Sequence, residues 1–461
     1  MEIRDSLSGS ILIESDELPI IDSRFFQRLR QIKQLGFAEY SFPSATHNRY
    51  IHSLGTMAIA TQAYDTIFGG QKSRITTTQQ SHKTLCQQSP ETFAKFRAAV
   101  RLASLLHDAG HGPLSHTTEI AMPDVEKLSI PGFNKYGRKA THEDFTLKII
   151  LDSSLSSHIE KAGNKYGFGA AHIASLIEPS ITVKDGFFMG YLNGHETDFS
   201  PLLRQLISSE LDADRMDYLR RDSANAGVSY GNFDVDWLVG NLTYHIDKGK
   251  CYLCLQHRAL YTFEDFLISR FHMFLMVYFH YKTVVFDSML ARFFSSQDCD
   301  YRFPVDIEKY CDYHDAHLYS HISKSNNKWA RRVAEKRPYK MLIEFYSGIP
   351  AGKAALQEQE RQFAAVKSEL EKLGVGYLVE TSTGELSKYF RTPSDPIFVK
   401  YDNHYNEPCY LPLERCTDLF QKYSEKRFIT RLYVSPEDYQ GCRKNGQILP
   451  FNFSEDGITS T

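Results

Sequence analysis

The sequence predicts a mainly α-helical fold, with a helical core over residues 1–300 and a smaller C-terminal α+β lobe over residues 301–461. Apolar residues recur at helical spacing through most of the first part, and mixed helical and extended patterns begin only after it. The chain has 461 residues, of which 42% are hydrophobic and 24% charged. These fractions are typical of a folded protein with a substantial core.

Charge and apolar patterning argue against two classes of partner. The formal net charge is −3, whereas affinity for a nucleic-acid backbone needs clustered Lys and Arg. No apolar run reaches the roughly 18 residues of a membrane span, and the first residues, MEIRD, do not open a signal peptide. We therefore expect a cytoplasmic protein that binds neither membranes nor, as its main task, nucleic acid.

The first part is expected to contain helices joined by one polar excursion and one β-hairpin. Helical periodicity predicts helices over residues 24–35, 54–67, 92–106, 142–152, 171–178, 201–222, 234–240 and 262–284. Gly36 ends the first of them. The polar stretch 69–90 predicts the excursion, and residues 242–257 predict the hairpin.

The C-terminal lobe combines one long helix with several strands. Residues 354–373 are strongly amphipathic and predict a helix. Extended patterns follow at 376–380, 396–400 and 429–434, and the residues from 452 onward are expected to be frayed. Cys251 and Cys254 form a CxxC within the expected hairpin, and we interpret them as packing cysteines because no second CxxC or HxxxH lies nearby.

The pair His107-Asp108 is the first candidate for chemistry. It ends an apolar helical segment, and Gly110 and Pro113 follow. Neighbouring residues point apart on a continuing helix, so a helix that ends here allows the imidazole and the carboxylate to converge on one ion.

A second cluster of acids supports a metal site. Asp214 and Asp217 are three residues apart on a predicted helix, where one side chain can bind an ion and the other can orient a ligand. His52, the pair His107-Asp108 and Asp214 form a His/His/Asp/Asp set, which suits Fe, Mn, Co, Ni or Zn better than Mg. A single His among the 18 in this chain is more often a surface or hydrogen-bonded residue, so the prediction depends on the whole set.

Five segments together resemble a known family. They are HNRYIHSLG at 47–55, HDAGHGPLSH at 107–116, THE at 141–143, LDADRMDY at 211–218, and Asp222. This pattern resembles the HD-domain phosphohydrolase superfamily, in the branch of deoxynucleoside triphosphate triphosphohydrolases that includes the animal SAM- and HD-domain enzyme and bacterial dGTPases. The resemblance covers roughly residues 1–285 and implies an HD-domain helical core.

The resemblance implies a metal centre and a catalytic group beside it. The implied metal ligands are His52, His107, Asp108 and Asp214, holding a transition metal, with Mg possible alongside the substrate. The implied catalytic residues are His111, Glu119, His142 and His116. Glu119 stands where better-known members of the family have Asp, so its reach differs.

The resemblance also implies a nucleotide pocket. The residues that match substrate contacts are Gln34, Leu35, Arg49, Arg215, Tyr218, Asp222, Arg270 and Tyr278. Arg49, Arg215, Tyr218 and Arg270 match phosphate contacts, and Arg215 replaces a Lys. Asp222 and Tyr278 match positions around the deoxyribose, and Gln34 and Leu35 match sugar and base contacts. Phe279 replaces a Gln of the family, so the preferred base stays open.

The implied activity is hydrolysis of a deoxynucleoside triphosphate to a deoxynucleoside and inorganic triphosphate. The family also forms homo-oligomers, so a dimer or tetramer is expected. Asp22, Gln27 and Arg30 match guanine-contacting positions of a regulatory site that binds an activating nucleotide. An amphipathic helix with basic residues needs no such ligand, so both interpretations of this segment stand.

Two other functions stay open on the sequence. The same metal site suits a phosphatase or phosphodiesterase acting on monophosphates, cyclic dinucleotides or alarmones. Alternatively, the fold serves as a nucleotide-sensing module without catalysis. The full set of expected ligand residues argues against the second alternative.

Overall fold

The computed structural model describes residues 1–69, 83–347, 353–387, 395–403, 405–422 and 426–445. Most of the predicted excursion at 69–90 and all of the tail expected to fray from 452 lie outside these ranges. At the end of the excursion, residues Leu85–Gln88 form the short helix α4, which was not expected.

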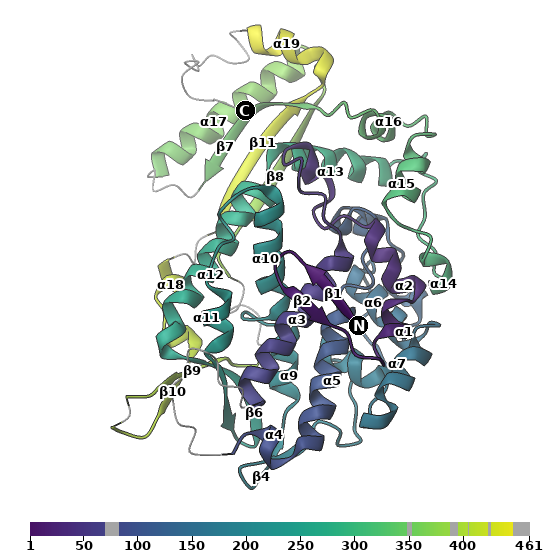
Figure 1. Cartoon of the computed structure of the whole chain (residues 1–461). Helices are drawn as coiled ribbons and strands as arrows, with labels where there is room; N and C mark the ends of the chain where they lie inside the picture. Colours follow the sequence, from purple (N-terminus) through teal and green to yellow (C-terminus); the bar gives the residue numbers. More distant parts are fainter. Residues whose placement is uncertain (70–82, 348–352, 388–394, 404, 423–425, 446–461) are drawn as a thin grey trace.

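The described chain is mainly α-helical, as predicted, and three helices carry most of the site. These are α3 (Arg49–Phe68), α5 (Pro90–Leu106) and α10 (Ala213–Ala226), and α3 packs against both of the others. Figure 1 shows them together in the lower body of the molecule. The other helices of this part are α1 (Leu18–Ile21), α2 (Arg24–Gln27), α6 (His142–Leu151), α7 (Ser156–Gly163), α8 (Ala170–Ile177), α9 (Ser200–Ile207), α11 (Val235–Gly240), α12 (Leu260–Met273) and α13 (Tyr281–Phe294).

Capping residues fix where the site helices begin and end. Asn48 Oδ1 accepts a hydrogen bond from Ile51 N at 3.3 Å and starts α3, and Asp212 Oδ1 accepts from Arg215 N at 2.8 Å and starts α10. Gly227, with φ of 71°, ends α10 in the left-handed conformation. These caps place candidate site residues in the first turns of their helices.

Three predicted helices are shorter or divided in the structure, which corrects the expectation. The helix expected at 24–35 is α2 followed by a 3-10 turn over Arg28–Gln31. The helix expected at 201–222 is divided into α9 and α10, because Asp212 caps a new helix there. The helix expected at 262–284 is interrupted by a π-helical turn over Phe274–Tyr278, which separates α12 from α13.

A six-stranded sheet lies beside the helices. The predicted hairpin forms β5 (Leu242–Asp247) and β6 (Lys250–Gln256). The path of the sheet is β10-β9-β6-β4-β3, with β5 paired to β6. The other strands are β3 (Met189–Leu192), β4 (His195–Asp198), β9 (Phe398–Tyr401) and β10 (Cys409–Pro412). Both CxxC cysteines are buried in β6 with free thiols, as expected of packing residues.

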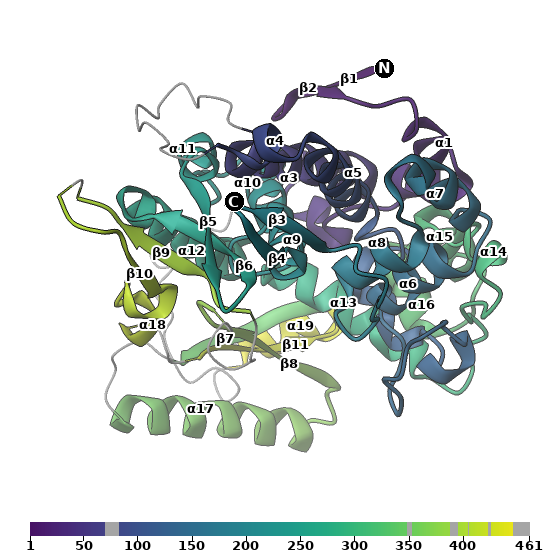
Figure 2. The same ribbon diagram turned by 90° about the horizontal axis from the view of Figure 1, so that it is seen from below.

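The C-terminal residues contribute both a separate sheet and parts of the core. Antiparallel strands β7 (Lys340–Ser347), β11 (Arg427–Val434) and β8 (Tyr377–Gly384) form a three-stranded sheet in that order. Helices α17 (Lys353–Lys372) and α19 (Pro436–Lys444) lie beside it at the top of Figure 1, and Figure 2 shows α17 along its outer side. Ile343, Val366, Leu370 and Leu432 form its small apolar core.

Other C-terminal elements pack directly on the helical core. They are α14 (Ile307–Tyr310), α15 (Asp315–Ile322), α16 (Lys328–Ala334) and α18 (Leu419–Lys422). Strand β9 lies parallel to β6 and so joins the sheet of the first part. The division into two domains at residue 300 stays a prediction.

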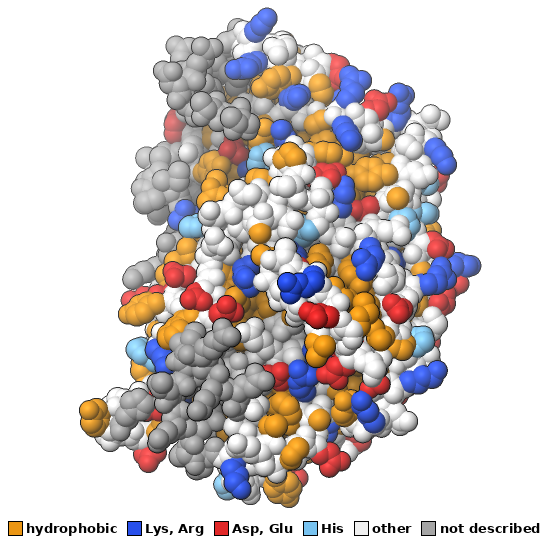
Figure 3. Space-filling view, in the orientation of Figure 1, with side chains coloured by type: hydrophobic (Ala, Val, Ile, Leu, Met, Phe, Trp, Pro, Cys, Tyr) orange, Lys and Arg blue, Asp and Glu red, His pale blue; other side chains and the backbone are white. Residues whose placement is uncertain are grey.

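The surface carries charges of both signs. Figure 3 shows Lys and Arg side chains interspersed with Asp and Glu on the face seen there. Among the described residues, no helix combines the length and the apolar character that a membrane crossing requires.

A short N-terminal hairpin closes over α3 and α10. It consists of β1 (Glu2–Asp5) and β2 (Gly9–Leu12), and Figure 1 shows it in front of these helices. Below it, α10 approaches α3 closely at Gly55. A Cβ at that position would lie 2.0 Å from Asp217 Oδ1 and 2.4 Å from Arg221 Nη2.

We expect Gly55→Ala to lower the free energy of unfolding by about 1–3 kcal/mol, because these buried charged groups cannot give way without breaking their contacts. Urea denaturation followed by circular dichroism measures the change. Gly441→Ala in α19 is the matched control, because no heavy atom lies within 4 Å of a Cβ there and the substitution has the same effect on helix propensity. Equal stability changes in the two variants would contradict the close approach.

Candidate functional site

Two histidines and two aspartates from three elements converge at the centre of the helical core. His52 lies in the first turn of α3, His107 and Asp108 follow α5, and Asp214 lies in the first turn of α10. His52 Nε2 lies 3.0 Å from Asp214 Oδ1 and 3.5 Å from Asp108 Oδ2. His107 Nε2 lies 3.5 Å from one oxygen of each aspartate. The structure therefore brings the four predicted metal ligands together.

The orientation of both imidazoles suits a metal ion. His107 Nδ1 donates to the Ser104 carbonyl at 2.7 Å, and His52 Nδ1 lies 2.9 Å from Asp217 Oδ2. Each Nε2 is buried and has no hydrogen-bond partner. One ligand atom from each of His52, His107 and Asp214 lies within 4.8 Å of the others. Two orphaned ring nitrogens facing carboxylates are a donor set for a divalent transition metal.

The carboxylates dominate the electrostatics of this cluster. Burial lowers the pKa of His52, but the nearby carboxylates of Asp108, Asp214 and Asp217 outweigh it and hold the pKa well above the usual value. Burial likewise lowers the pKa of His107, and Asp108 and Asp214 raise it by more. Asp214 is 32% exposed while His52 is fully buried, so the cluster opens to solvent on one side.

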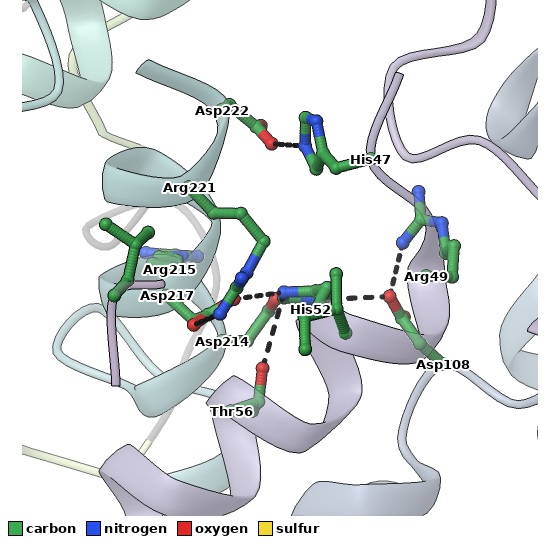
Figure 4. Close-up of polar contacts among 12 residues, drawn as sticks. His47, Arg49, His52, Thr56, Asp108, Asp214, Arg215, Asp217, Arg221 and Asp222 are labelled. Atoms are coloured by element: carbon green, nitrogen blue, oxygen red, sulfur yellow. Dashed lines mark hydrogen bonds and ion pairs between the residues drawn. The ribbon is translucent and has the colours of Figure 1, made fainter. Parts of the chain in front are cut away.

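Arginines compensate the buried aspartates. Arg49 Nη1 donates to Asp108 Oδ2, and Arg49 Nε donates to Ser115 Oγ at 2.9 Å. Arg221 donates through Nε and Nη2 to the two oxygens of Asp217, each at 2.8 Å. Figure 4 shows His52 between the two aspartate–arginine pairs. Arg49 was predicted as a phosphate contact, and in this structure its guanidinium is bound to Asp108.

A second group of histidines lies next to the first. His111 and His142 stack with ring centroids 3.8 Å apart, and the exposed ring of His116 packs edge-on against both. Glu119 Oε1 lies within hydrogen-bond distance of Nδ1 of His116 and of His142. His111 Nε2 lies 3.4 Å from Asp108 Oδ1, so this group adjoins the metal cluster. The four predicted catalytic residues are thus assembled.

Neighbouring charges tune this second group. Burial raises the pKa of Glu119, but hydrogen bonds from His116 and His142 outweigh it and hold the pKa well below the usual value. Burial, Arg49 and His142 together hold the pKa of His111 well below its usual value. A neutral His111 and an ionised Glu119 follow at neutral pH.

Contacts from distant residues hold the loop after α5. Arg28 donates to the carbonyls of Ala109 and His111, and Tyr310 Oη donates to the Gly110 carbonyl at 2.8 Å. These bonds satisfy backbone carbonyls of the loop that follows α5. The backbone direction of this loop therefore depends on α14 as well as on α5.

The next turn is strained and clamped. Leu114 and Ser115 have φ of 56° and 59°, a conformation that costs non-glycine residues energy. Asp315 in α15 accepts hydrogen bonds from Leu114 N at 2.7 Å and from Lys33 N at 3.0 Å. Because Ser115 Oγ bonds Arg49, this clamp also fixes the partner of Asp108.

Three of the predicted pocket residues lie along α10 and the π-helical turn. Tyr278 Oη donates to Asp222 Oδ2 at 2.8 Å, and the rings of Tyr218 and Tyr278 pack edge-on at 6.3 Å. Burial raises the pKa of Tyr218 to about 12, so its hydroxyl stays protonated. His47 Nε2 lies 2.7 Å from Asp222 Oδ1, as Figure 4 shows.

The remaining predicted pocket residues have protein partners. Arg215 Nη1 donates to Glu210 Oε2 at 2.7 Å, and Arg270 Nη1 donates to the Leu386 carbonyl at 2.9 Å. The Nε of Arg270 is buried without a hydrogen-bond partner. Gln34 N donates to the His47 carbonyl at 3.0 Å, and Leu35 follows it at the edge of the core.

The predicted regulatory residues lie near the N-terminus. Arg30 Nε donates to Gln27 Oε1 at 2.8 Å, and Gln27 Nε2 donates to the Ile21 carbonyl at 2.8 Å. The exposed Asp22 follows α1. These contacts fit both interpretations of the segment, an amphipathic helix that needs no ligand and a regulatory site that binds a nucleotide.

Sequence reasoning missed three residues that orient the site: His47, Arg221 and Asp315. His47 lies inside the segment 47–55 that carries the family resemblance, and Arg221 directly precedes Asp222, which was the available signal. No sequence signal pointed to Asp315, because its partner Lys33 is 282 positions away in the chain.

The site is a buried set of nitrogen and oxygen atoms at the ends of helices, and such a set is typical of a divalent-metal centre. Family models agree: the HD domain matches residues 49–222, and the HD associated region matches residues 233–370. The chain belongs to the HD-domain phosphohydrolase superfamily.

Individual relatives point the same way. The chain is 30% identical to an uncharacterized protein of Methanocaldococcus jannaschii over 74% of its length and 59% of the relative. It is 28% identical to a homolog of deoxynucleoside triphosphate triphosphohydrolase SAMHD1 from Dictyostelium discoideum, over 64% of this chain and 49% of the relative. The match thus spans about half to three fifths of these relatives.

A solved structure has the same fold. The crystal structure of a hypothetical protein from Aquifex aeolicus has a TM-score of 0.68 and 24% identity, over 96% of this chain and 98% of the other.

We expect Asp315→Ala to lower the free energy of unfolding by about 2 kcal/mol or more, because the buried N–H of Leu114 in the strained turn and the part-buried N–H of Lys33 both lose their acceptor. Chemical denaturation at neutral pH measures the loss. Asp312→Ala is the control, since Asp312 pairs with Arg24 where both side chains are largely exposed, and it should change stability little. A loss no greater than that of the control would contradict the clamp.

Proposed function

We propose that the protein is a metal-dependent deoxynucleoside triphosphate triphosphohydrolase that releases a deoxynucleoside and inorganic triphosphate. The observation that carries the proposal is the pair of buried, unpartnered Nε2 atoms of His52 and His107 facing Asp108 and Asp214. The similarity to a homolog of a named deoxynucleoside triphosphate triphosphohydrolase supports the choice of substrate.

His52, His107, Asp108 and Asp214 would hold the ion. The nitrogen-rich set favours Fe, Mn, Co, Ni or Zn, with Mg joining the site only with the substrate. When bound, a divalent ion supplies a water of lowered pKa and a Lewis acid for a phosphoryl oxygen. Because Asp214 is partly exposed, the substrate would approach the cluster from that side.

The spacing of three residues along α10 supports a nucleoside triphosphate as the substrate. Asp214, Tyr218 and Asp222 are four residues apart and share one helix face, so Asp222 lies roughly 12 Å along the axis from Asp214. That span leaves room for the deoxyribose beside Asp222 when the α-phosphate lies at the metal. Arg215 and Arg270 flank this path, and each would exchange a present partner, Glu210 or the Leu386 carbonyl, for phosphate oxygens.

Asp222 and Tyr278 would select the sugar. Their mutual hydrogen bond, together with that of His47, fixes the Tyr278 ring. A ring fixed under C2′ leaves no room for a ribose hydroxyl. Gln34 and Leu35 would contact the sugar and base.

The second histidine group would deliver the proton to the leaving 5′-oxygen. His116 is the exposed member, and its Nδ1 bonds Glu119, so the opposite ring nitrogen is available to a ligand. Glu119 lies within hydrogen-bond distance of Nδ1 of both His116 and His142 and would orient the ring that donates the proton. Neutral His111 packs beneath them and keeps the stack in place.

Three further expectations remain proposals: assembly into a dimer or tetramer, activation by a nucleotide at Asp22, Gln27 and Arg30, and a cytoplasmic location.

We expect His107→Ala and Asp214→Ala to lose bound metal and turnover of every deoxynucleoside triphosphate, because each removes a ligand atom from the centre. The test incubates purified protein with Mn²⁺ and each substrate, detects inorganic triphosphate, and measures metal content on separate samples. His195→Ala, an exposed histidine of β4, is the control and should keep both properties.

The products distinguish the alternatives. Orthophosphate from monophosphates would favour a phosphatase, and absence of turnover with bound metal would favour a sensor. Wild-type turnover in either ligand variant would show that the metal assignment is wrong.

We expect Tyr278→Ala to lose discrimination against ribonucleoside triphosphates, because the ring that crowds C2′ is removed. Tyr278→Phe keeps the ring and loses only the bond to Asp222, so it should keep most of the selectivity. The ratio of kcat/KM for matched deoxy and ribo substrates measures the effect. An unchanged ratio in Tyr278→Ala would remove this residue from the sugar pocket.

A further inference from the structure

We propose that Asp5, in the N-terminal strand β1, is a positioning residue for the metal ligand His52 and acts on it through Arg221 and Asp217. The inference rests on the proposed function, since it assumes that His52 binds an ion. It extends the centre to a strand that contains no predicted site residue.

An unbroken chain of hydrogen bonds joins the two ends. Asp5 accepts from Arg221 Nη1 at 2.9 Å and from Nη2 at 3.1 Å. Arg221 in turn donates to both oxygens of Asp217 at 2.8 Å. Asp217 Oδ2 lies 2.9 Å from His52 Nδ1. Figure 4 shows Arg221, Asp217 and His52 in this order.

This chain of hydrogen bonds fixes which ring nitrogen His52 presents to the ion. Arg221 donates to both oxygens of Asp217 and holds the carboxylate in place, so its Oδ2 accepts a hydrogen bond from His52 Nδ1–H. That leaves the lone pair of Nε2 aimed at Asp108 and Asp214. A carboxylate behind a metal-bound imidazole also raises its basicity and holds its ring plane.

Arg221 can hold Asp217 in this pose only while it is itself oriented. The guanidinium is a planar fork, and here it makes paired contacts with a carboxylate on each side. Without Asp5, one side of the fork would be unpaired and Arg221 would be held by Asp217 alone. The guanidinium would then compete with His52 Nδ1 for the oxygens of Asp217.

The cost of the arrangement argues against a purely structural role. The side chains of Asp5, Arg221 and Asp217 are each 2% exposed or less. Burying three charges is expensive, and apolar residues often anchor a hairpin equally well. The helix α3 also gives up a side chain at Gly55 to admit Asp217 and Arg221.

Asp5 has one local contact that a test must separate. Its Oδ2 accepts from Leu7 N and Ser8 N in the turn between β1 and β2. A structural role in that turn predicts lower stability with unchanged metal affinity. A positioning role predicts lower metal affinity, whatever the change in stability.

The experiment measures Mn²⁺ affinity of the full chain by competition with a chelator of known affinity, without substrate. We expect Asp5→Asn to raise the Mn²⁺ dissociation constant about 10-fold, the lower end of the range for outer partners of metal ligands. Thermal unfolding with and without Mn²⁺ should show a smaller metal-dependent rise of Tm in the variant than in the wild type. Arg221→Lys keeps the charge but not the fork, and should also weaken binding.

Glu2→Gln is the matched control, because it removes one negative charge from an exposed position of the same strand, and it should bind Mn²⁺ like the wild type. Wild-type affinity in both Asp5→Asn and Arg221→Lys would overturn the inference while leaving the metal centre intact. Failure of the wild type to bind Mn²⁺ or any other divalent ion would overturn the proposed function and this inference together. If Asp5→Asn does not fold, the Arg221→Lys affinity decides.

Discussion

The burial of carboxylates is the constraint on which the rest of this structure depends. A carboxylate inside a helical core is tolerated only where cations and hydrogen-bond donors surround it. Arg49 forms an ion pair with Asp108, and Arg221 forms ion pairs with both Asp217 and Asp5. These partners come from α3, α10 and the N-terminal hairpin, so the same ion pairs that make the site possible also join the elements of the fold.

The backbone around the site is held in the same way, by residues that are distant in sequence. The loop after α5 presents carbonyls that Arg28 and Tyr310 satisfy, and the strained turn at Leu114 is clamped by Asp315. Two of these three residues come from the region after residue 300. That region therefore helps to shape the site, although none of the predicted ligands or catalytic residues lies within it.

Sequence patterns predicted what depends on neighbours along the chain and missed what depends on distant partners. Helix α5 was found close to its true bounds, because apolar spacing reflects the face that it buries. Helix α3 begins at Arg49, five residues before its predicted start, because Asn48 caps it there. The break before α10 was missed, because Asp212 is equally compatible with a helix interior until its capping bond is seen. In the site, the ligands were recognisable as a pattern. The Arg221–Asp5 pair was not, because 216 positions separate its members.

The charge balance of the assembled centre gives an independent reason to expect a divalent cation. Four buried or half-buried carboxylates, those of Asp5, Asp108, Asp214 and Asp217, face only the two guanidinium groups of Arg49 and Arg221. Arg215 is already matched by Glu210 and contributes no surplus. Two negative charges therefore remain beside two imidazoles, and the neighbouring carboxylates raise the pKa values of His52 and His107. A divalent ion held by His52, His107, Asp108 and Asp214 would neutralise the same surplus with the histidines uncharged, the form in which they are ligands.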